Sequence, residues 1–412
     1  MEKLYELKDI LEQEGLMDQD VNLETRYASA VRNPKVRDFF GLETPQITDL
    51  TDLLQIENNG RLYAVRMDLN EGVDDHKKQV VAGLILRGVL KERIPKEGID
   101  TLIDGGNFNS GKAFKYYAEK LGFNYIHVMS RLFPQEIIWL LESNRVQVIQ
   151  APKTTGKSIE REFYSYLREL MTKEEFRKNK YCLWHAKDGG KAMYPFGIEI
   201  AEKLEDAPDY VVSCLGAGST LEGLQIAVQD YFKGKPSIVI AEHELSPLFA
   251  QFIDYEKSKG FPKIVKESVK INPNFYETVK ELPHIVIGPH YQEINPLISK
   301  KAIKKIDKVV QYSENDWMAM QKFLKKHGIS VGNSSAANIN AASQLANEGN
   351  NVLTVIFEPF RKFYKKHHDL PWLFRWETLP QKIAMTAAGI AWMLFGIYYV
   401  LNVDPNAPAL PY

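Results

Sequence analysis

The chain has 412 residues, 44% of them hydrophobic, so it can bury a full core and form two or three domains or subdomains. Its 52 basic and 53 acidic residues give a formal net charge of -1, which argues against a nucleic-acid partner and favours a small-molecule ligand. The two cysteines, Cys182 and Cys214, lack a neighbouring histidine or cysteine at metal-ligand spacing, so we expect neither a disulfide framework nor a metal site.

The first 40 residues are predicted to form a helical N-terminal extension. Met1–Glu14 is charged and follows a helical period, unlike the basic start and apolar run of a secretory signal. Together with the low cysteine content, this pattern predicts a cytoplasmic protein in a reducing compartment.

From about Leu62 to Phe357, short apolar runs alternate with longer amphipathic segments. The runs are rich in β-branched residues and predict strands at Leu62–Met67, Thr101–Asp104, Tyr125–Met129, Val146–Gln150, Tyr210–Leu215, Ser237–Glu242 and Val352–Phe357. The segments between them predict helices at Lys77–Lys91, Lys112–Leu121, Ser158–Thr172, Leu221–Phe232 and Glu314–Lys326. This alternation predicts an α/β fold with mostly parallel sheets, and we place the main body of the chain at residues 41–364.

The pair His76-Lys77 starts the first of these helices, and three later segments have complementary chemistry. These are Gly105–Gly111, Gly216–Thr220 and Gly328–Ala337, the last with Ser334 and Ser335 before an alanine-rich helix. A lysine at a helix start is usually a solvated charge. A lysine amine, an anion cradle and a hydroxyl for a ring nitrogen are, however, what pyridoxal phosphate requires.

Gly216-Ala217-Gly218-Ser219-Thr220 follows an apolar strand and precedes a helix. Its consecutive amides can cradle a phosphate while Ser219 and Thr220 add hydroxyl donors. A dinucleotide fingerprint would need a third glycine where Leu221 stands, so this loop does not match one.

The order and spacing of these segments resemble the fold-type II pyridoxal-phosphate enzymes, the superfamily of cysteine synthase, cystathionine β-synthase and the tryptophan synthase β-chain. Thr44-Pro45 resembles the opening of that superfamily, and His76-Lys77 is similar to the pair in the tryptophan synthase β-chain. The Ser-x-Lys-Asp-Arg pattern of cysteine synthases is missing here. The resemblance covers roughly residues 40–357 and leaves the subfamily open.

The resemblance implies two mostly parallel α/β subdomains with pyridoxal 5'-phosphate in the cleft between them, and a homodimer. Lys77 would carry the Schiff base, Gly216–Thr220 the phosphate, and Ser334 would face the pyridine nitrogen. Asn109-Ser110-Gly111 resembles the substrate-carboxylate loop of these enzymes, so Asn107, Asn109, Ser110 and Gly111 are the predicted substrate residues, with Asn109 also bonding the cofactor. Taken alone, this segment would be an ordinary turn of Gly, Asn and Ser.

The implied reaction is β-replacement or β-elimination on serine, O-acylserine or a related amino acid, as a lyase or transferase. The sequence departs from the superfamily at Phe108 and Ala336, where relatives have glycine, and Glu358–Tyr364 replaces a Pro-Ser-Gly-Glu-Arg-Tyr stretch. These departures leave open a scaffold that keeps the fold but has altered catalysis.

A competing motif lies at Ala151–Ser158, which nearly matches the phosphate loop of nucleotide hydrolases through Gly156-Lys157-Ser158. Asp104 would then be the magnesium-side carboxylate. The first glycine of that pattern is Ala151 here, and turn and capping chemistry also explains Gly-Lys-Ser at a helix start.

The C-terminal region is predicted to comprise a basic linker at residues 365–382, a helix at Ile383–Leu401 and a tail at residues 402–412. Ile383–Leu401 has no charged residue and is long enough to cross a bilayer. Basic residues precede it and only Asp404 follows, so a spanning helix would leave the body facing the cytoplasm. The alternative is an interface helix that packs on the body or on a partner subunit.

Overall fold

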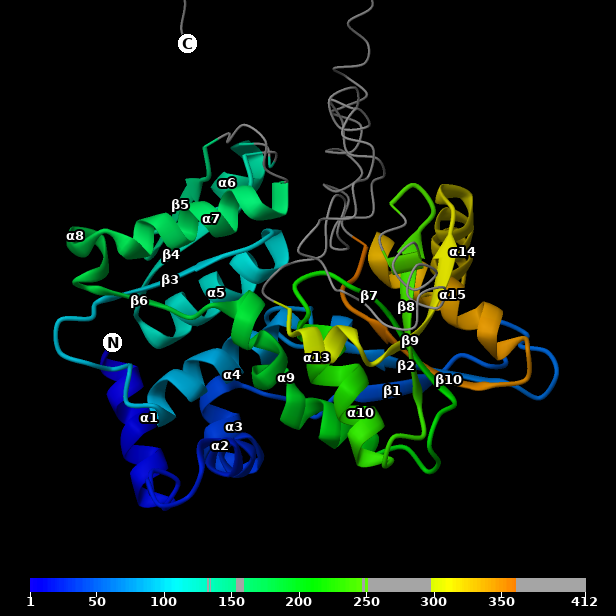
Figure 1. Ribbon diagram of the computed structural model, residues 1–412, viewed down its shortest axis with the longest axis horizontal. Coiled ribbons are helices and arrows are strands. Elements are labelled where there is room, and N and C mark those ends of the chain that lie inside the picture. Colours follow the sequence, from blue (N-terminus) through cyan, green and yellow to red (C-terminus); the bar gives the residue numbers. More distant parts are fainter. Residues whose placement is uncertain (132, 134, 153–158, 247–248, 251–297, 361–412) are drawn as a thin grey trace, which may run out of the picture. The chain divides into compact units, whose positions relative to one another are not determined.

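Two β-sheets and the helices that cover them organise residues 1–360 (Figure 1). The computed structural model describes residues 1–131, 133, 135–152, 159–246, 249–250 and 298–360, without the side chains of residues 159–162 and 300. Gly156-Lys157-Ser158, the linker at 365–382, Ile383–Leu401 and the tail at 402–412 lie outside the described residues. None of the helices in the described ranges is long and apolar enough to cross a membrane.

The larger sheet has six strands in the order β1-β2-β10-β7-β8-β9, and only the edge strand β1 runs antiparallel to its neighbour. Its strands are β1 (Gln46–Asp49), β2 (Arg61–Arg66), β7 (Tyr210–Cys214), β8 (Ser237–His243), β9 (Ile306–Tyr312) and β10 (Asn351–Ile356). The smaller sheet is fully parallel in the order β5-β4-β3-β6. Its strands are β3 (Thr101–Gly105), β4 (Asn124–Met129), β5 (Val146–Gln150) and β6 (Lys180–Cys182).

Three helices precede the first strand, and the others lie in the connections between strands. They are α1 (Glu2–Gln13), α2 (Leu23–Arg32), α3 (Pro34–Phe40), α4 (Lys77–Leu90), α5 (Phe108–Leu121), α6 (Gln135–Leu141), α7 (Ile159–Thr172), α8 (Glu174–Arg177), α9 (His185–Ala201), α10 (Ile226–Tyr231), α13 (Lys300–Ile303), α14 (Glu314–Lys326) and α15 (Asn333–Ala346). A 3₁₀ turn, η1 (Met67–Leu69), follows β2, and a π-helix, η2 (Leu221–Gln225), precedes α10. The predicted α/β class with mostly parallel sheets is confirmed.

The sequence located all seven predicted strands to within one or two residues at each end. It missed β1, β6 and β9, and it placed the start of α5 at Lys112 although the helix begins at Phe108. The earlier start has a clear cause, since Asn107 is the N-cap and its Oδ1 accepts a hydrogen bond from the Ser110 amide at 3.4 Å. Residues 109–111 therefore lie within the first turn of the helix.

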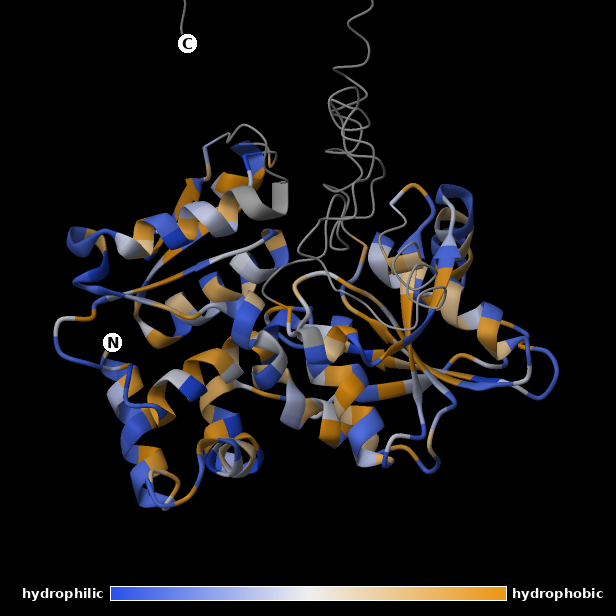
Figure 2. Cartoon of the chain, in the orientation of Figure 1, coloured by the Kyte–Doolittle hydropathy of each residue, from blue (hydrophilic) through white to orange (hydrophobic). Residues whose placement is uncertain are grey.

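Helices α1–α3 pack onto the rest of the chain. Leu4, Leu7 and Leu11 are fully buried and belong to the same hydrophobic cluster as the strands of the larger sheet. The hydroxyl of Tyr27 donates to the carbonyl of Ala192 in α9. The N-terminal helices therefore share the core that supports α4 and α9. Each of these helices carries both hydrophobic and hydrophilic residues (Figure 2).

The loops of interest follow the carboxyl ends of parallel strands, where ligands of α/β proteins bind. Segment 105–111 follows β3, segment 216–220 follows β7, and Phe357-Glu358 follows β10. Because β7 and β10 pair in parallel, the last two segments emerge at the same edge of the larger sheet.

Candidate active site

Lys77 is the first residue of α4, and its side chain is only 5% exposed. Its Nζ donates to the Oγ of Ser219 over 3.0 Å, which brings the lysine to the glycine loop that follows β7. Asp75 fixes this helix start, since its Oδ1 accepts a hydrogen bond from the backbone amide of Lys77 at 2.7 Å. Lys78 is also buried, but its Nζ lies 3.9 Å from Oε1 of Glu43 and so has a different partner.

Burial lowers the pKa of the Lys77 amine to about 8, against the opposing effect of the carboxylates of Asp75 and Asp104. Removing a charged amine from water disfavours its protonated form, whereas nearby carboxylates favour that form. A pKa about 8 makes the neutral, nucleophilic amine far more abundant near neutral pH than for an exposed lysine. This electrostatic setting suits a lysine that forms a covalent bond to a carbonyl compound.

Segment 216–220 has the geometry of an anion cradle. Gly218 has a φ of +89°, which favours glycine, and an added Cβ would lie 2.7 Å from Cγ1 of Ile298. Within the described part of the chain, the amides of Gly216, Ala217 and Gly218 donate to no protein acceptor. These amides and the first turn of η2 therefore offer donors to an anion, beside the hydroxyl groups of Ser219 and Thr220.

The loop between β3 and α5 contacts His127 of β4, in the smaller sheet. The hydroxyl of Ser110 donates to the carbonyl of Asn107 over 2.8 Å, and His127 Nε2 lies 3.2 Å from the same carbonyl. These two contacts hold the backbone carbonyl of Asn107, the residue whose side chain caps α5. An added Cβ on Gly111 would lie 2.9 Å from His127 Nε2, so this position accepts only glycine without rearrangement.

Asn109 contacts a residue that the sequence did not single out as a site residue. Its Nδ2 donates to Oε2 of Glu358 over 2.7 Å. Glu358 is 4% exposed and follows β10, so the contact joins the start of α5 to the larger sheet. The ring of His76 lies against Phe357, with 4.7 Å between the ring centroids, which brings the start of α4 to the same place.

The two serines at the start of α15 have different surroundings. The Oγ of Ser335 accepts hydrogen bonds from the amides of Phe357 at 2.9 Å and Glu358 at 3.4 Å, so this serine fixes the end of β10. The hydroxyl of Ser334 has no partner among the residues that the structure describes. Ser334 is 5% exposed, and its backbone carbonyl lies 3.9 Å from Sγ of Cys214 at the end of β7. Of the two hydroxyl groups, that of Ser334 is available to a ligand.

A buried polar pair lies under the loop between β3 and α5. Asp104 accepts hydrogen bonds from the backbone amide of His185 at 2.8 Å and from that of Gly105 at 2.7 Å, and its Oδ1 lies 3.2 Å from His185 Nδ1. This carboxylate is therefore already engaged in the interior and is not arranged as the magnesium ligand of a nucleotide hydrolase. The described residues contain no cluster of three or more His, Cys, Asp or Glu side chains that could hold a metal ion.

Sequence reasoning missed His185 and Glu358 as site residues and considered Asp104 only for the nucleotide motif. His185 and Asp104 are 81 positions apart, and Glu358 and Asn109 are 249 apart, so no local spacing relates them. The one available signal was placement: Asp104 and Glu358 each lie at the carboxyl end of a parallel strand.

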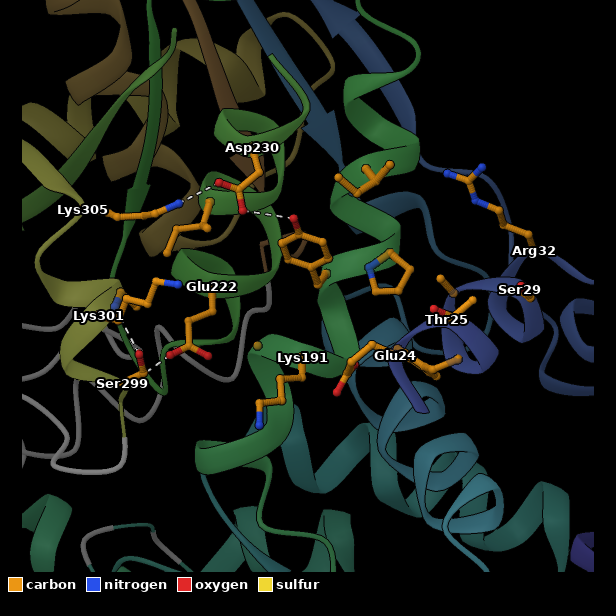
Figure 3. Close-up of a pocket in the computed structure, with 18 residues that line it drawn as sticks. Glu24, Thr25, Ser29, Arg32, Lys191, Glu222, Asp230, Ser299, Lys301 and Lys305 are labelled. Carbon is orange, nitrogen blue, oxygen red and sulfur yellow. Dashed lines mark hydrogen bonds and ion pairs between the residues drawn. The ribbon is translucent and has the colours of Figure 1, made fainter. Parts of the chain in front are cut away.

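A cavity of about 710 Å³ lies away from Lys77, between α2, α9, η2, α10 and α13 (Figure 3). Two contacts pair polar groups in its wall: Lys305 Nζ lies 2.7 Å from Asp230 Oδ1, and Oε1 of Glu222 accepts from the Ser299 amide at 3.1 Å. None of the predicted site residues lines it.

The family model described as "Pyridoxal-phosphate dependent enzyme" matches residues 44–358. The chain belongs to this family of pyridoxal-phosphate dependent enzymes. The match covers the whole segment from Thr44 to Glu358 that carries the predicted loops, and the cofactor of the family is pyridoxal phosphate. A comparison with curated protein sequences finds no significant match.

Solved structures of two other proteins share the fold. An O-acetylserine dependent cystathionine beta-synthase from Helicobacter pylori is 21% identical, with a TM-score of 0.58, over 79% of this chain and 94% of that one. An O-acetyl serine sulfhydrylase, isoform 3, from Entamoeba histolytica is 17% identical, with a TM-score of 0.61, over 80% and 90%. At these identities the likeness establishes the fold.

The residues of the site fit the cofactor of the family. The Lys77 amine, with its lowered pKa, can react with the aldehyde of pyridoxal phosphate. The amides of Gly216–Gly218, which have no acceptor in the described residues, can bind its phosphate. The hydroxyl of Ser334, which has no partner in the described part of the chain, matches a neutral ring nitrogen.

Proposed function

We propose that the protein catalyses β-replacement or β-elimination on serine, O-acylserine or a related amino acid, as a lyase or transferase that uses pyridoxal phosphate. The observation that carries the proposal is the buried Lys77 amine, 3.0 Å from Ser219 in a glycine loop whose neighbouring amides have no acceptor in the described residues. The family match and the fold shared with an O-acetylserine dependent cystathionine beta-synthase and an O-acetyl serine sulfhydrylase support it.

In this proposal Lys77 binds the cofactor covalently. Gly216, Ala217, Gly218, Ser219 and Thr220 hold its phosphate through backbone amides and hydroxyl groups. Ser334 faces the ring nitrogen and Asn109 bonds the ring hydroxyl. The hydrogen bond from Asn109 to the buried carboxylate of Glu358 orients the Asn109 side chain.

The first turn of α5 would bind the substrate carboxylate, with Asn107, Asn109, Ser110 and Gly111 as the contact segment, because helix N-termini attract anions. The bound cofactor supplies an electron sink that makes the α-proton of an amino acid acidic. The Lys77 amine, with a pKa about 8, is placed to take up that proton and to return it.

Reduction with borohydride followed by peptide mapping tests the assignment. The purified protein should be yellow, and the label should appear on Lys77. Lys77→Gln should abolish both labelling and activity, whereas Lys78→Gln is the matched control, because Lys78 is equally buried but contacts Glu43. A protein that cannot be reconstituted with the cofactor, or a label on Lys78, refutes the proposal.

We also infer that Ile383–Leu401 anchors the protein to a membrane and that the catalytic body lies in the cytoplasm. We further infer that the protein acts as a homodimer. The support for the anchor is its charge-free length and the basic residues on one side, and the support for the dimer is the family. A chain that ends at Phe360, where the compact unit ends, should keep its cofactor and stay in the supernatant without detergent. If the full-length chain is already in the supernatant as an oligomer that the truncation dissociates, the segment is an interface helix.

A further inference from the structure

His185 is held in one orientation by Asp104. Both side chains are buried, at 3% and 0% exposure, and Nδ1 of His185 lies 3.2 Å from Oδ1 of Asp104. A carboxylate beside Nδ1 fixes the proton on that nitrogen, so Nε2 is the nitrogen left for other chemistry. The backbone amide of His185 donates to the other carboxylate oxygen over 2.8 Å, which anchors the residue twice.

The first turn of α9 brings His185 to the candidate site. Gly189 lies one turn after His185 on the same face, and an added Cβ there would be 3.3 Å from Val80 of α4 and 3.4 Å from Cβ of Ser219. That face of α9 therefore lies between the helix of Lys77 and the glycine loop. On the substrate side, an added Cβ on Gly106 would be 2.9 Å from Cε1 of His185, so the ring edge lies against the loop before α5.

Three histidines of this region differ in how their rings are held. His127 uses both ring nitrogens, on the hydroxyl of Tyr125 at 2.9 Å and on the carbonyl of Asn107 at 3.2 Å. His76 has its Nδ1 3.0 Å from Asp75 without a hydrogen bond in the described residues, so its ring is positioned by packing against Phe357. In the described part of the chain, Nε2 of His185 has no hydrogen-bond partner, and it is not among the atoms sealed from solvent. A histidine oriented by a carboxylate with a free Nε2 is an arrangement for proton transfer.

We propose that His185 is the proton donor for the β-substituent of the substrate, and that the preferred substrate is therefore an amino acid with a free β-hydroxyl group, such as serine. In this step His185 starts with a proton on each ring nitrogen. The Cβ–O bond breaks, its electron pair goes to the oxygen, and the oxygen takes the Nε2 proton and leaves as water. The electron pair of the broken Cα–H bond forms the Cα–Cβ double bond. The α-proton goes to the Lys77 amine. His185 regains its proton from solvent, and Asp104 stabilises the charged ring. This inference rests on the proposed function.

The contribution of this proton transfer to the reaction rate depends on the leaving group. Hydroxide is the conjugate base of water, with a pKa of about 15.7, so it leaves readily only when protonated. A carboxylate leaving group, such as acetate from O-acetylserine, is the conjugate base of an acid with a pKa of about 4 and leaves without a proton. Removing His185 should therefore slow the reaction of serine and spare that of O-acetylserine.

Steady-state kinetics of the holoenzyme test this difference. His185→Gln should lower kcat/KM for serine by about 100-fold or more, the usual contribution of a general acid, and change that for O-acetylserine by less than about threefold. His127→Gln is the matched control, because this buried histidine supports the same loop and its loss should affect both substrates equally. If His185→Gln loses its cofactor, Asp104→Asn takes its place and should show the same preference.

A binding measurement gives a readout that needs no turnover. α-Methylserine and 2-aminoisobutyrate both lack an α-proton and differ in the β-hydroxyl group. Calorimetric titration of the wild-type holoenzyme should give about tenfold tighter binding of α-methylserine, since a hydrogen bond to a charged group contributes about 1.5 kcal/mol. His185→Gln should abolish that preference.

Equal losses for serine and O-acetylserine, no loss for serine, or an unchanged binding preference each overturn the assignment of His185. So does a wild-type holoenzyme that uses O-acetylserine but not serine. Failure of the proposed function looks different, because the wild-type protein would then carry no label on Lys77 after borohydride reduction.

Discussion

Replacing Lys77 with methionine should stabilise the cofactor-free protein near neutral pH, although it removes the proposed catalytic residue. Burial lowers the pKa of Lys77 from 10.5 to about 8. The protonated amine therefore costs the folded state about 3 kcal/mol. Methionine has a similar shape and no charge, but it loses the hydrogen bond to Ser219, which is worth about 1 kcal/mol. The net gain in the free energy of unfolding is therefore about 2 kcal/mol.

The gain should depend on pH in a defined direction. Below the folded-state pKa about 8, Lys77 is protonated in both states and the cost is complete. Between that value and the unfolded-state value of 10.5, the unfolded chain binds more protons, so the stability of the wild-type protein rises with pH. At about pH 9.5 the remaining cost is only about 1 kcal/mol, so the net advantage of methionine falls to nearly zero after the lost hydrogen bond is subtracted.

Urea denaturation of the cofactor-free proteins at about pH 7 and about pH 9.5 measures both quantities. Lys187→Met is the control, because Lys187 is exposed on α9 and its replacement should change stability by less than about 0.5 kcal/mol at either pH. A Lys77→Met variant that is less stable than the wild type at neutral pH, or an advantage that does not shrink with pH, would show that the amine is not desolvated as the geometry indicates.

Three substitutions separate the roles of the other site residues. Thr220→Ala should weaken cofactor affinity by about tenfold or more, because a hydrogen bond to a charged phosphate is worth about 1.5–3 kcal/mol, and an unchanged affinity in an equilibrium titration would exclude this loop. Ser334→Ala should change the visible spectrum and turnover more than cofactor affinity, since the hydroxyl has no structural partner in the described residues. Ser335→Ala should instead lower the free energy of unfolding by about 1–3 kcal/mol, because its buried Oγ accepts two backbone amides.

The glycine loops were predictable because their chemistry is local. Gly218 needs a positive φ after a strand, and hydroxyl-bearing residues follow it at once, so a short stretch of sequence contains the whole signal. The partners of such loops were not predictable. Ser219 meets Lys77 across 142 positions, and only the order of the parallel strands brings them together.

Helix α9 illustrates a second limit. Its sequence contains Gly189, Gly190, Pro195 and Gly197, all of which disfavour a helix interior, so local propensity gave no reason to predict it. The same glycines allow α9 to lie close to α4 and η2, because side chains at these positions would strike neighbouring residues. Tertiary packing thus overrides propensity, and the residue at the start of the helix, His185, was missed with it.

The missed strands have a related cause. β6 has only three residues, and β9 carries Asp307 and Lys308 in a strand at the edge of the larger sheet. Edge strands tolerate charges because one side of them faces solvent, so their sequences lack the continuous apolar run of a central strand.

The buried carboxylate of Asp104 joins the two proposed proton-transfer groups. It raises the pKa of Lys77 against the larger effect of burial, and it also holds Nδ1 of His185. Asp104→Asn should therefore lower the pKa of Lys77 further, which alters α-proton transfer for every substrate alike. It also removes the carboxylate oxygen that holds Nδ1 of His185, which matters only when the leaving group needs a proton. The loss for serine beyond the loss for O-acetylserine measures the contribution of His185, and the shared loss measures that of Lys77.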